Sequence, residues 1–352
     1  MTEANKKVGG LGLPVTKGTF QLAGFVSGTE SDRFYTDAKT KTGKARRAIN
    51  FAVIFNTDKK QYVEISGMEQ ENAFFSKSEL DRTTGKRNTE TIKVPWHDRI
   101  KPQAPGFEPI GLTCGLETRL DETGSSKNVN THFVPFDGCE YLARNLKDEM
   151  PVFVTGNLTY STYEGKHYKK CEANRISLSR RNLDFDDPEF EQTCEFQQRI
   201  VFTSIEQSAD KSKFIVNAKI VAYNSIEDVE FFVYNADLAK IIRKKLKPYD
   251  AINVAGYINI VKNEEEDDDE GWWGVSHAVK RAPTVVEFVI DGVDPKTLDS
   301  GVYTEENINE AISKAKSNRQ AKEDFGDNEV DTPWGKAVEI KEDDDYNEED
   351  EW

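Results

Sequence analysis

Short runs of alternating apolar and polar residues recur along the chain, and they predict β-strands. Residues 19–26, 47–55 and 61–66 are rich in β-branched and aromatic side chains, which is typical of half-buried strands. A long polar loop separates the first two runs. Residues 76–111 are basic and contain several prolines, and we interpret them as an inserted hairpin or loop outside the core.

A helix followed by a hairpin is predicted after this insertion. Leu142 and Leu146 lie on one face of a helix over residues 140–147, and Asp137 is a candidate N-cap. After Pro151, the stretches VFVTGNLTYS and KHYKKCEANRISLS flank the tip TYEGK. Two strand-like stretches around a tip that contains glycine predict a β-hairpin.

The same order of elements recurs 100 positions later. Residues 236–247 predict a second helix, with Ile242 in the place of Leu142. AINVAGYINIVKN then matches PVFVTGNLTYSTY, with Gly256 in the place of Gly156. Three strand-like stretches, QRIVFTSIEQ, KFIVNAKIVAY and DVEFFVY, precede this helix, and TVVEFVI follows the hairpin. The chain therefore contains a duplicated domain.

Three strands, a helix and a two-stranded hairpin form the order of the OB-fold, a five-stranded Greek-key barrel. The sequence therefore predicts a mainly β chain, with two tandem OB-fold barrels and a disordered acidic C-terminal tail. The expected parts are a flexible N-terminal arm at 1–16, a first OB-fold domain at 17–182 with the inserted loop 76–111, a second OB-fold domain at 195–292, a possible helix at 305–321 and the tail at 322–352.

The formal net charge of −16 is distributed unevenly. Residues 1–182 hold 28 Lys and Arg against 22 Asp and Glu, a net charge of +6. Residues 183–321 hold 16 against 27 and residues 322–352 hold 3 against 14, so each of these segments carries −11. We expect the basic first domain to be the main nucleic-acid-binding part, and the acidic second domain to bind less tightly and to dock partners or dimerise.

The stretch YLARNLKDEMPVFVTGNLTYSTYEGKHYKKCEANRISLS resembles the matching part of bacterial single-stranded-DNA-binding proteins. The tail, which ends in EDDDYNEEDEW, is similar to the acidic tails with a terminal aromatic residue in bacterial and phage members of this class. Trp352 stands where the family often has Phe, and the Ile-Pro step of the bacterial tail is absent. The bacterial type also has one domain, so the tandem arrangement favours a virus-encoded protein, for example from a phage.

The resemblance implies binding and protection of single-stranded DNA in replication, recombination and repair. The net charge of −11 at residues 322–352 predicts that the acidic tail competes with DNA for the basic groove of the first domain. The terminal aromatic residue predicts recruitment of other replication or recombination proteins, with Trp352 as the partner-docking residue. A homo-oligomer is a possible assembly.

A binder of single strands needs cations along the phosphates and aromatic rings that stack on the bases. The first domain interleaves both kinds of side chain in its first long loop, in the insertion and in the hairpin. The candidate nucleic-acid-binding residues are Arg33, Phe34, Tyr35, Lys39, Lys41, Lys44, Arg46, Arg47, Lys86, Arg87, Lys93, Trp96, Arg99, Tyr160, Tyr163, Lys166, His167, Tyr168, Lys169 and Lys170.

Each of these residues also has a plainer interpretation. A single Lys or Arg is usually solvated surface, and alternate aromatic residues of the hairpin can point into the core. Trp96 can anchor the inserted loop by packing, and His97 and His167 fit ordinary polar residues better than metal ligands. Trp272 and Trp273 stand beside an acidic run that repels phosphate, so they fit barrel packing or protein contact better than DNA contact.

Nothing in the sequence predicts an enzyme, a cofactor or a metal site, because it contains no phosphate loop, GxSxG or HExxH motif. Cys114, Cys139, Cys171 and Cys194 form no CxxC pair, and we expect them to be reduced thiols. No apolar stretch is long enough for a membrane span, and residues 1–12 do not resemble a signal peptide. We therefore expect a cytoplasmic protein, in the host cytoplasm if it is viral.

Three other functions remain open from the sequence, and the first is a metal-dependent nuclease, which a metal-dependence assay would separate from a binder. The charge of residues 183–352 fits an acidic protein that mimics DNA, as an inhibitor or a protein-interaction factor. Single-stranded RNA is the third alternative, because OB barrels bind both polymers.

Overall fold

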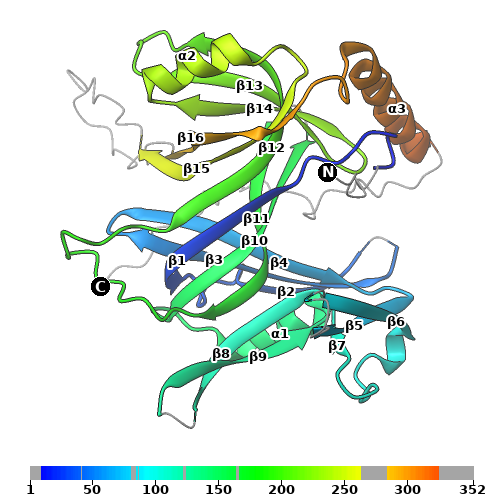
Figure 1. Cartoon of the computed structure of the whole chain (residues 1–352). Helices are drawn as coiled ribbons and strands as arrows, with labels where there is room; N and C mark the ends of the chain where they lie inside the picture. Colours follow the sequence, from blue (N-terminus) through cyan, green and yellow to red (C-terminus); the bar gives the residue numbers. More distant parts are fainter. Residues whose placement is uncertain are drawn as a thin grey trace, which may run out of the picture.

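Two closed five-stranded β-barrels form the body of the molecule (Figure 1). The computed structural model describes residues 9–40, 42–80, 85, 87–121, 124–163, 166–262 and 284–324. Barrel 1 consists, in order around the barrel, of β1 (Gly18–Ser27), β3 (Ala45–Asn56), β4 (Lys59–Met68), β11 (Lys166–Leu178) and β10 (Pro151–Tyr163). Barrel 2 repeats this order with β12 (Cys194–Gln207), β13 (Phe214–Val221), β14 (Ile226–Val233), β16 (Thr284–Asp299) and β15 (Ala251–Lys262).

The connections identify both barrels as OB-folds. In each barrel the third and fifth strands pair in parallel, β4 with β11 and β14 with β16, and the other pairs are antiparallel. This is the five-stranded Greek-key arrangement that the sequence order predicts. The predicted fold class, mainly β with two tandem barrels, is confirmed for the described residues.

A helix lies between the third and fourth strands of each barrel. These helices are α1 (Pro135–Asn145) and α2 (Ala236–Lys245), and Leu142 and Ile242 are buried as the repeat predicts. Asn235 caps α2, because its side chain accepts hydrogen bonds from two amides of the first turn. The N-cap expected at Asp137 is wrong, since α1 begins at Pro135 and Asp137 lies inside its first turn.

The two barrels join through an antiparallel pair of first strands, β1 and β12, so that one buried core extends through both. Phe20 pairs with Phe196 across this junction, and each phenylalanine also pairs with a glycine of its own hairpin, Gly156 or Gly256. A Cβ at Gly156 would lie 2.0 Å from the carbonyl oxygen of Glu172, and one at Gly256 would lie 1.8 Å from that of Val289. This close approach explains why both copies of the repeat keep glycine here.

The N-terminal segment and the C-terminal helix pack together on barrel 2. Leu11 and Leu13 are buried in a small core that includes Tyr303 and Ile308, and the amide of Thr16 donates to the Val221 carbonyl over 2.9 Å. Residues 9–16 are therefore part of the folded body, which corrects the expectation of a flexible arm for them. The helix expected at 305–321 is present as α3 (Glu305–Asp324).

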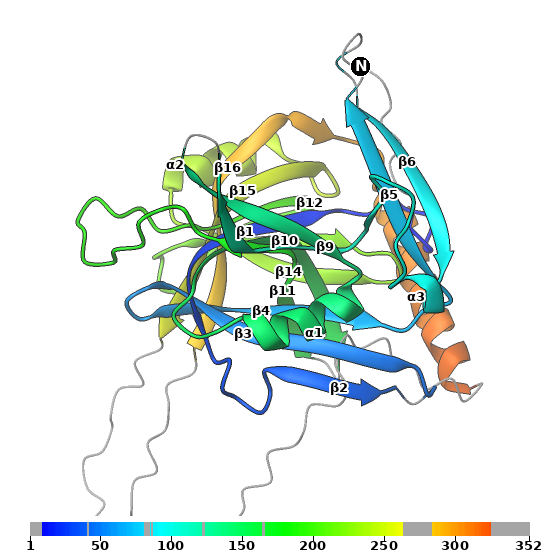
Figure 2. The same ribbon diagram turned by 90° about the horizontal axis from the view of Figure 1, so that it is seen from below.

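The insertion into barrel 1 is folded. β5 (Asn72–Leu80), β6 (Arg87–Pro95) and the short β7 (Glu108–Pro109) form a separate sheet, with the 3-10 helix η1 (Trp96–Asp98) after β6. Figure 2 shows β5 and β6 as a long hairpin at the side of the molecule. A second hairpin, β8 (Leu112–Leu120) and β9 (Ser126–Phe133), extends barrel 1 by a parallel pairing of β8 with β11. The first hairpin is one of the two alternatives predicted for residues 76–111, whereas the second hairpin was not predicted.

The strand β2 (Tyr35–Lys39) completes the fold by pairing with β3, and together they form a hairpin in the long polar loop that follows β1. In the part of the chain that the structure describes, no helix has the length and apolar character needed to cross a membrane.

Candidate nucleic-acid interface

The outer surface of β4 and β11 in barrel 1 presents aromatic and cationic side chains. Val63 and Ile65 point into the barrel core, so strand alternation places Lys60, Tyr62 and Glu64 on the outside. Tyr62 is 64% exposed, and the Lys60 ammonium lies 5.5 Å from the centre of its ring. An exposed aromatic ring beside a cation is the arrangement on which an unpaired base can stack.

Neighbouring strands extend this surface. β11 pairs with β4 in parallel, Glu172 opposite Glu64, so that Lys170 lies beside Tyr62 and the exposed Tyr168 lies two residues further along β11. On the other side Tyr62 is opposite Ala52 of β3, whose small side chain leaves the ring uncovered. We call the outer side chains of Lys60, Tyr62, Glu64, Tyr168 and Lys170 the barrel-1 face.

Glu64 is the buried acid of the barrel-1 face. Its side chain is 3% exposed, and Oε1 lies 3.4 Å from Nη2 of Arg46. Burial raises the pKa of Glu64 to about 8 and lowers the pKa of Lys170 to about 8, because both charged forms lose solvent. Burial therefore disfavours the ionised form of both groups, while Arg46 adds a positive charge beside Glu64.

The β2–β3 hairpin supplies cations of two kinds. Lys39 and Lys44 are exposed, as is Arg33 in the loop that precedes β2. Arg47, in contrast, is held by Asp37 at 3.0 Å and Glu140 at 2.7 Å. Its guanidinium also lies 4.2 Å above the Phe136 ring, so Arg47 links the hairpin to α1. Arg46 is likewise partly buried against Glu64.

Two aromatic side chains in the first long loop belong to the core. Phe34 is 6% exposed and sits in the main hydrophobic cluster, so the prediction that it stacks bases is wrong. Tyr35 is half-buried against the same cluster, and its hydroxyl donates to Asp37.

The insertion is anchored by residues that the sequence assigned to DNA. Arg99 makes two hydrogen bonds of 2.9 Å to the carboxylate of Asp137, and its guanidinium lies 4.2 Å above the Trp96 ring. The Trp96 ring contacts Phe136 edge to face at 5.7 Å. Trp96 therefore anchors the insertion by packing, as its alternative interpretation predicts. Arg99 strengthens this anchor by joining the Trp96 ring to Asp137. Arg87 and Lys93 are exposed on β6.

The β10–β11 hairpin reaches barrel 2. Tyr160 is 8% exposed, with its ring centre 6.4 Å from that of Phe288. Lys169 donates from Nζ to the Glu230 carbonyl over 3.1 Å, and the same ammonium lies 5.3 Å from the Phe288 ring centre. Burial lowers the pKa of Lys169. Tyr160 and Lys169 thus join the barrels, and the prediction that they contact DNA is corrected.

Several predicted positions lie outside what the structure describes. These are Lys41 and Lys86, the side chains of Tyr163, Lys166 and His167 at the hairpin tip, Trp272 and Trp273, and the tail from residue 325 to Trp352.

Lys60 and Tyr62 are absent from the predicted set, although Tyr62 stands in the run QYVEIS that predicts a strand and Lys60 directly precedes it. Gln61 is also buried, so simple alternation of polar and apolar residues does not single out Tyr62 as the exposed position. The signal that could have found it is its place on the third strand of an OB barrel, whose second and third strands form the usual ligand surface.

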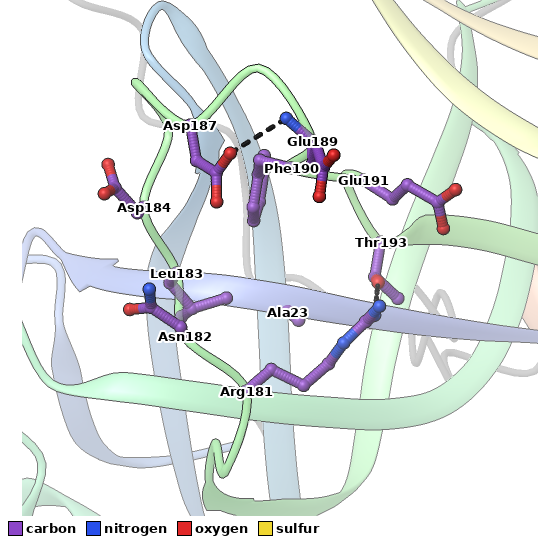
Figure 3. A pocket seen from close by; sticks show the side chains of 10 residues that line it. All are labelled: Ala23, Arg181, Asn182, Leu183, Asp184, Asp187, Glu189, Phe190, Glu191 and Thr193. Atoms are coloured by element: carbon purple, nitrogen blue, oxygen red, sulfur yellow. Dashed lines mark hydrogen bonds between the residues drawn. The ribbon is translucent and has the colours of Figure 1, made fainter.

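Two hollows lie away from this face. Figure 3 shows a pocket of about 170 Å³ beside the segment between the barrels, where Arg181 donates to the Thr193 hydroxyl over 2.7 Å. Its acidic lining, Asp184, Asp187 and Glu189 among others, repels phosphate, and the described residues contain no cluster suited to a metal ion. A groove of about 680 Å³ crosses the β1–β12 junction and is polar without being basic.

Comparison with known proteins places the chain in a family. Residues 37–328 match the family model YorF. The chain belongs to the YorF family. No protein among the curated sequences matches this YorF-family chain.

Solved structures give distant similarities. A deletion mutant of the single-stranded DNA binding protein from Thermus aquaticus matches with 11% identity and a TM-score of 0.36, over 82% of this chain and 97% of that one. The wild-type form of that protein gives 10% identity and a TM-score of 0.35, over 79% and 91%. A Replication Protein A heterotrimer bound to single-stranded DNA gives 7% identity and a TM-score of 0.21, over 80% and 93%.

Proposed function

We propose that this chain binds single-stranded DNA without strong sequence preference, through the barrel-1 face. The observation that carries the proposal is the exposed Tyr62 ring, with Lys60 above it and Lys170 beside it, on the third strand of a closed OB barrel. Stacking on such a ring tolerates every base, because every base has a π-face. Lysine side chains along the same surface follow the phosphates.

The exposed residues of the barrel-1 face can fill this role. Tyr62 and Tyr168 supply the rings and Lys60 lies over Tyr62, while the half-buried Lys170 lies beside Tyr62. The exposed hairpin cations Lys39 and Lys44 add positive charge at the far end of β3. This set is smaller than the one the sequence predicts, because the paired arginines and the buried rings stabilise the fold instead.

The decisive test is Tyr62→Ala, measured by fluorescence anisotropy with oligo-dT. Loss of one stacked base costs roughly 1–3 kcal/mol, so affinity should fall about fivefold to about a hundredfold. Tyr223→Ala is the matched control, since Tyr223 is 56% exposed on barrel 2. Equal affinity of the two variants would contradict the proposal. A matched oligo-U in the same titration reports the preference between DNA and RNA.

We further propose the biological setting that the sequence supports, protection of single strands in replication, recombination and repair, in a phage or other virus. The acidic tail competes with DNA for the basic surface of barrel 1, and Trp352 docks a partner protein that acts on the same DNA. The support is the charge of residues 322–352, 14 acidic against 3 basic residues, and the aromatic terminal residue.

A further inference from the structure

Barrel 2 is acidic overall, yet the helix α2 and the turn that follows it carry a concentrated set of cations. Lys240, Arg243, Lys244, Lys245 and Lys247 fall within eight residues, and all five are exposed. The helix packs on the barrel through Ala239, Ile242 and Leu246. Figure 1 shows α2 over the end of barrel 2 that points away from barrel 1.

Three of these cations share one side of the helix. Lys240, Arg243 and Lys244 have the spacing i, i+3, i+4, which places neighbouring Cβ atoms about 5–6 Å apart. Lys247 follows two residues after the helix ends at Lys245, beyond the extended C-cap Leu246. We call these four residues the α2 stripe. Closely spaced, exposed cations match a ligand that carries several negative charges.

The α2 stripe differs from other cations of barrel 2 in how many of its members form ion pairs. Arg199 pairs with Asp299, Lys213 with Glu287 and Lys219 with Asp228. In the stripe only Lys240 pairs with a described carboxylate, that of the exposed Asp237. Arg243 instead lies 5.9 Å from the ring centre of Phe214. Three cations of barrel 2 are thus held in ion pairs, whereas Arg243, Lys244 and Lys247 have no ion pair among the described residues.

Helix stability does not account for the α2 stripe. Cations in the last turn of a helix favour its dipole, but α1 ends with the same backbone hydrogen bond and has a single cation there, Arg144, which pairs with Glu140. The two helices occupy equivalent places in duplicated barrels. Helix stability therefore does not require the extra cations of α2, which leaves ligand binding as their role.

We propose that the α2 stripe is a second phosphate-binding surface for single-stranded nucleic acid, so that a long strand contacts both barrels. The inference rests on the proposed function, since the ligand is the same. A single OB barrel covers roughly 4–16 nucleotides, and α2 lies at the opposite end of the molecule from barrel 1 (Figure 1). The stripe therefore acts on long oligonucleotides and not on short ones.

The test replaces Lys240, Arg243, Lys244 and Lys247 by Gln in the full chain. The matched control replaces four exposed lysines off the stripe, Lys245, Lys296, Lys314 and Lys316, by Gln, with the same change in net charge. Binding of oligo-dT of about 8 and about 40 nucleotides is titrated with salt. Circular dichroism and Tm establish that each variant folds, and pairwise variants of the stripe replace the quadruple variant if it does not.

For the long oligonucleotide, each lost phosphate contact lowers the salt slope of log Kobs by roughly 0.7, so the stripe variant should lose up to about 3 units of slope and about tenfold or more in affinity at low salt. The short oligonucleotide and the control variant should change less than about twofold. Equal effects of the stripe and control variants would overturn the inference, as would no effect of either. If the wild-type protein binds oligo-dT and Tyr62→Ala weakens that binding, the proposed function stands. A stripe variant without effect then contradicts the role of the α2 stripe alone.

Discussion

At the scale of single residues, Glu64 sets the charge of the barrel-1 face. An ionised carboxylate beside a surface that binds phosphates weakens that binding. Burial raises the pKa of Glu64 to about 8. The Lys170 pKa moves down to about 8 for the same reason. As pH rises through this range, Glu64 gains a negative charge and Lys170 loses its positive charge. The positive charge of the face therefore falls, and its attraction for phosphate weakens.

This titration predicts a pH dependence of binding. Affinity for oligo-dT should fall between about pH 6 and about pH 9, and Glu64→Gln should bind more tightly than wild type at the upper end with a small difference at the lower end. The measurement is anisotropy at constant ionic strength. A wild-type and a Glu64→Gln curve that run parallel across the range would show that Glu64 does not titrate there.

The four cysteine thiols are buried and should be unreactive in the folded protein. All are buried, and burial raises the pKa of Cys114, Cys139 and Cys171 to about 12 and also that of Cys194. Since the thiolate is the reactive form, iodoacetamide should label none of them in the native protein and all four after denaturation. Intact-protein mass spectrometry counts the labels. Rapid native labelling of one thiol would reveal a local opening of the barrel at that position.

At the scale of elements, the segment before β1 stabilises barrel 2, although it enters barrel 1. Leu11 and Leu13 pack with Tyr303 and Ile308, and the Tyr303 hydroxyl donates to the Pro14 carbonyl over 2.9 Å. The segment and α3 lie near opposite ends of the chain, yet they pack together on the same side of barrel 2.

Deleting residues 1–16 should therefore lower the stability of the protein, whereas deleting residues 1–8 should change it little. Each buried leucine lost costs roughly 2–5 kcal/mol, which is several degrees in Tm. Thermal unfolding followed by circular dichroism distinguishes the two deletions. If both melt at the wild-type temperature, the packing of residues 9–16 is dispensable.

Elements with a strong local pattern could be predicted from the sequence. The apolar spacing of Leu142 and Ile242, and the glycines at 156 and 256, identify both helices and both hairpins, since they repeat. The β8–β9 hairpin was missed because polar residues such as Asn128, Asn130 and Thr131 dominate β9, a strand without a fully buried position. Tyr160 and Lys169 were assigned to DNA because their burial depends on Phe288, which is distant in the sequence. Phe34 was assigned to DNA because its loop is polar, although its ring packs in the main hydrophobic cluster.

At the scale of the whole molecule, the barrels are connected by backbone and by side chains. β1 pairs with β12, the Tyr160 ring packs on Phe288, and Thr162 donates to the Glu227 carboxylate. One hydrophobic cluster includes residues of both barrels. The barrels should therefore not unfold separately.

Calorimetry should show one cooperative transition, with the calorimetric enthalpy equal to the van't Hoff enthalpy. Leu142→Ala in barrel 1 and Ile242→Ala in barrel 2 should each move the whole transition down, since each leaves a cavity worth roughly 2–5 kcal/mol. Two resolved peaks in either variant would mean that the barrels are independent folding units.

The last prediction concerns the acidic tail, which the structure does not describe beyond α3. Residues 325–352 contain 12 Asp and Glu against 2 Lys, and a deletion that begins at 325 leaves α3 complete. If the tail competes with DNA for the cations of barrel 1, this deletion should raise affinity for oligo-dT, most at low salt, where charges are least screened. Trp352→Ala keeps the charge, so it should leave DNA affinity unchanged while weakening capture of a partner that acts on DNA. Unaltered affinity of the truncated chain at low salt would reject competition, and partner capture that is indifferent to Trp352 would independently reject docking.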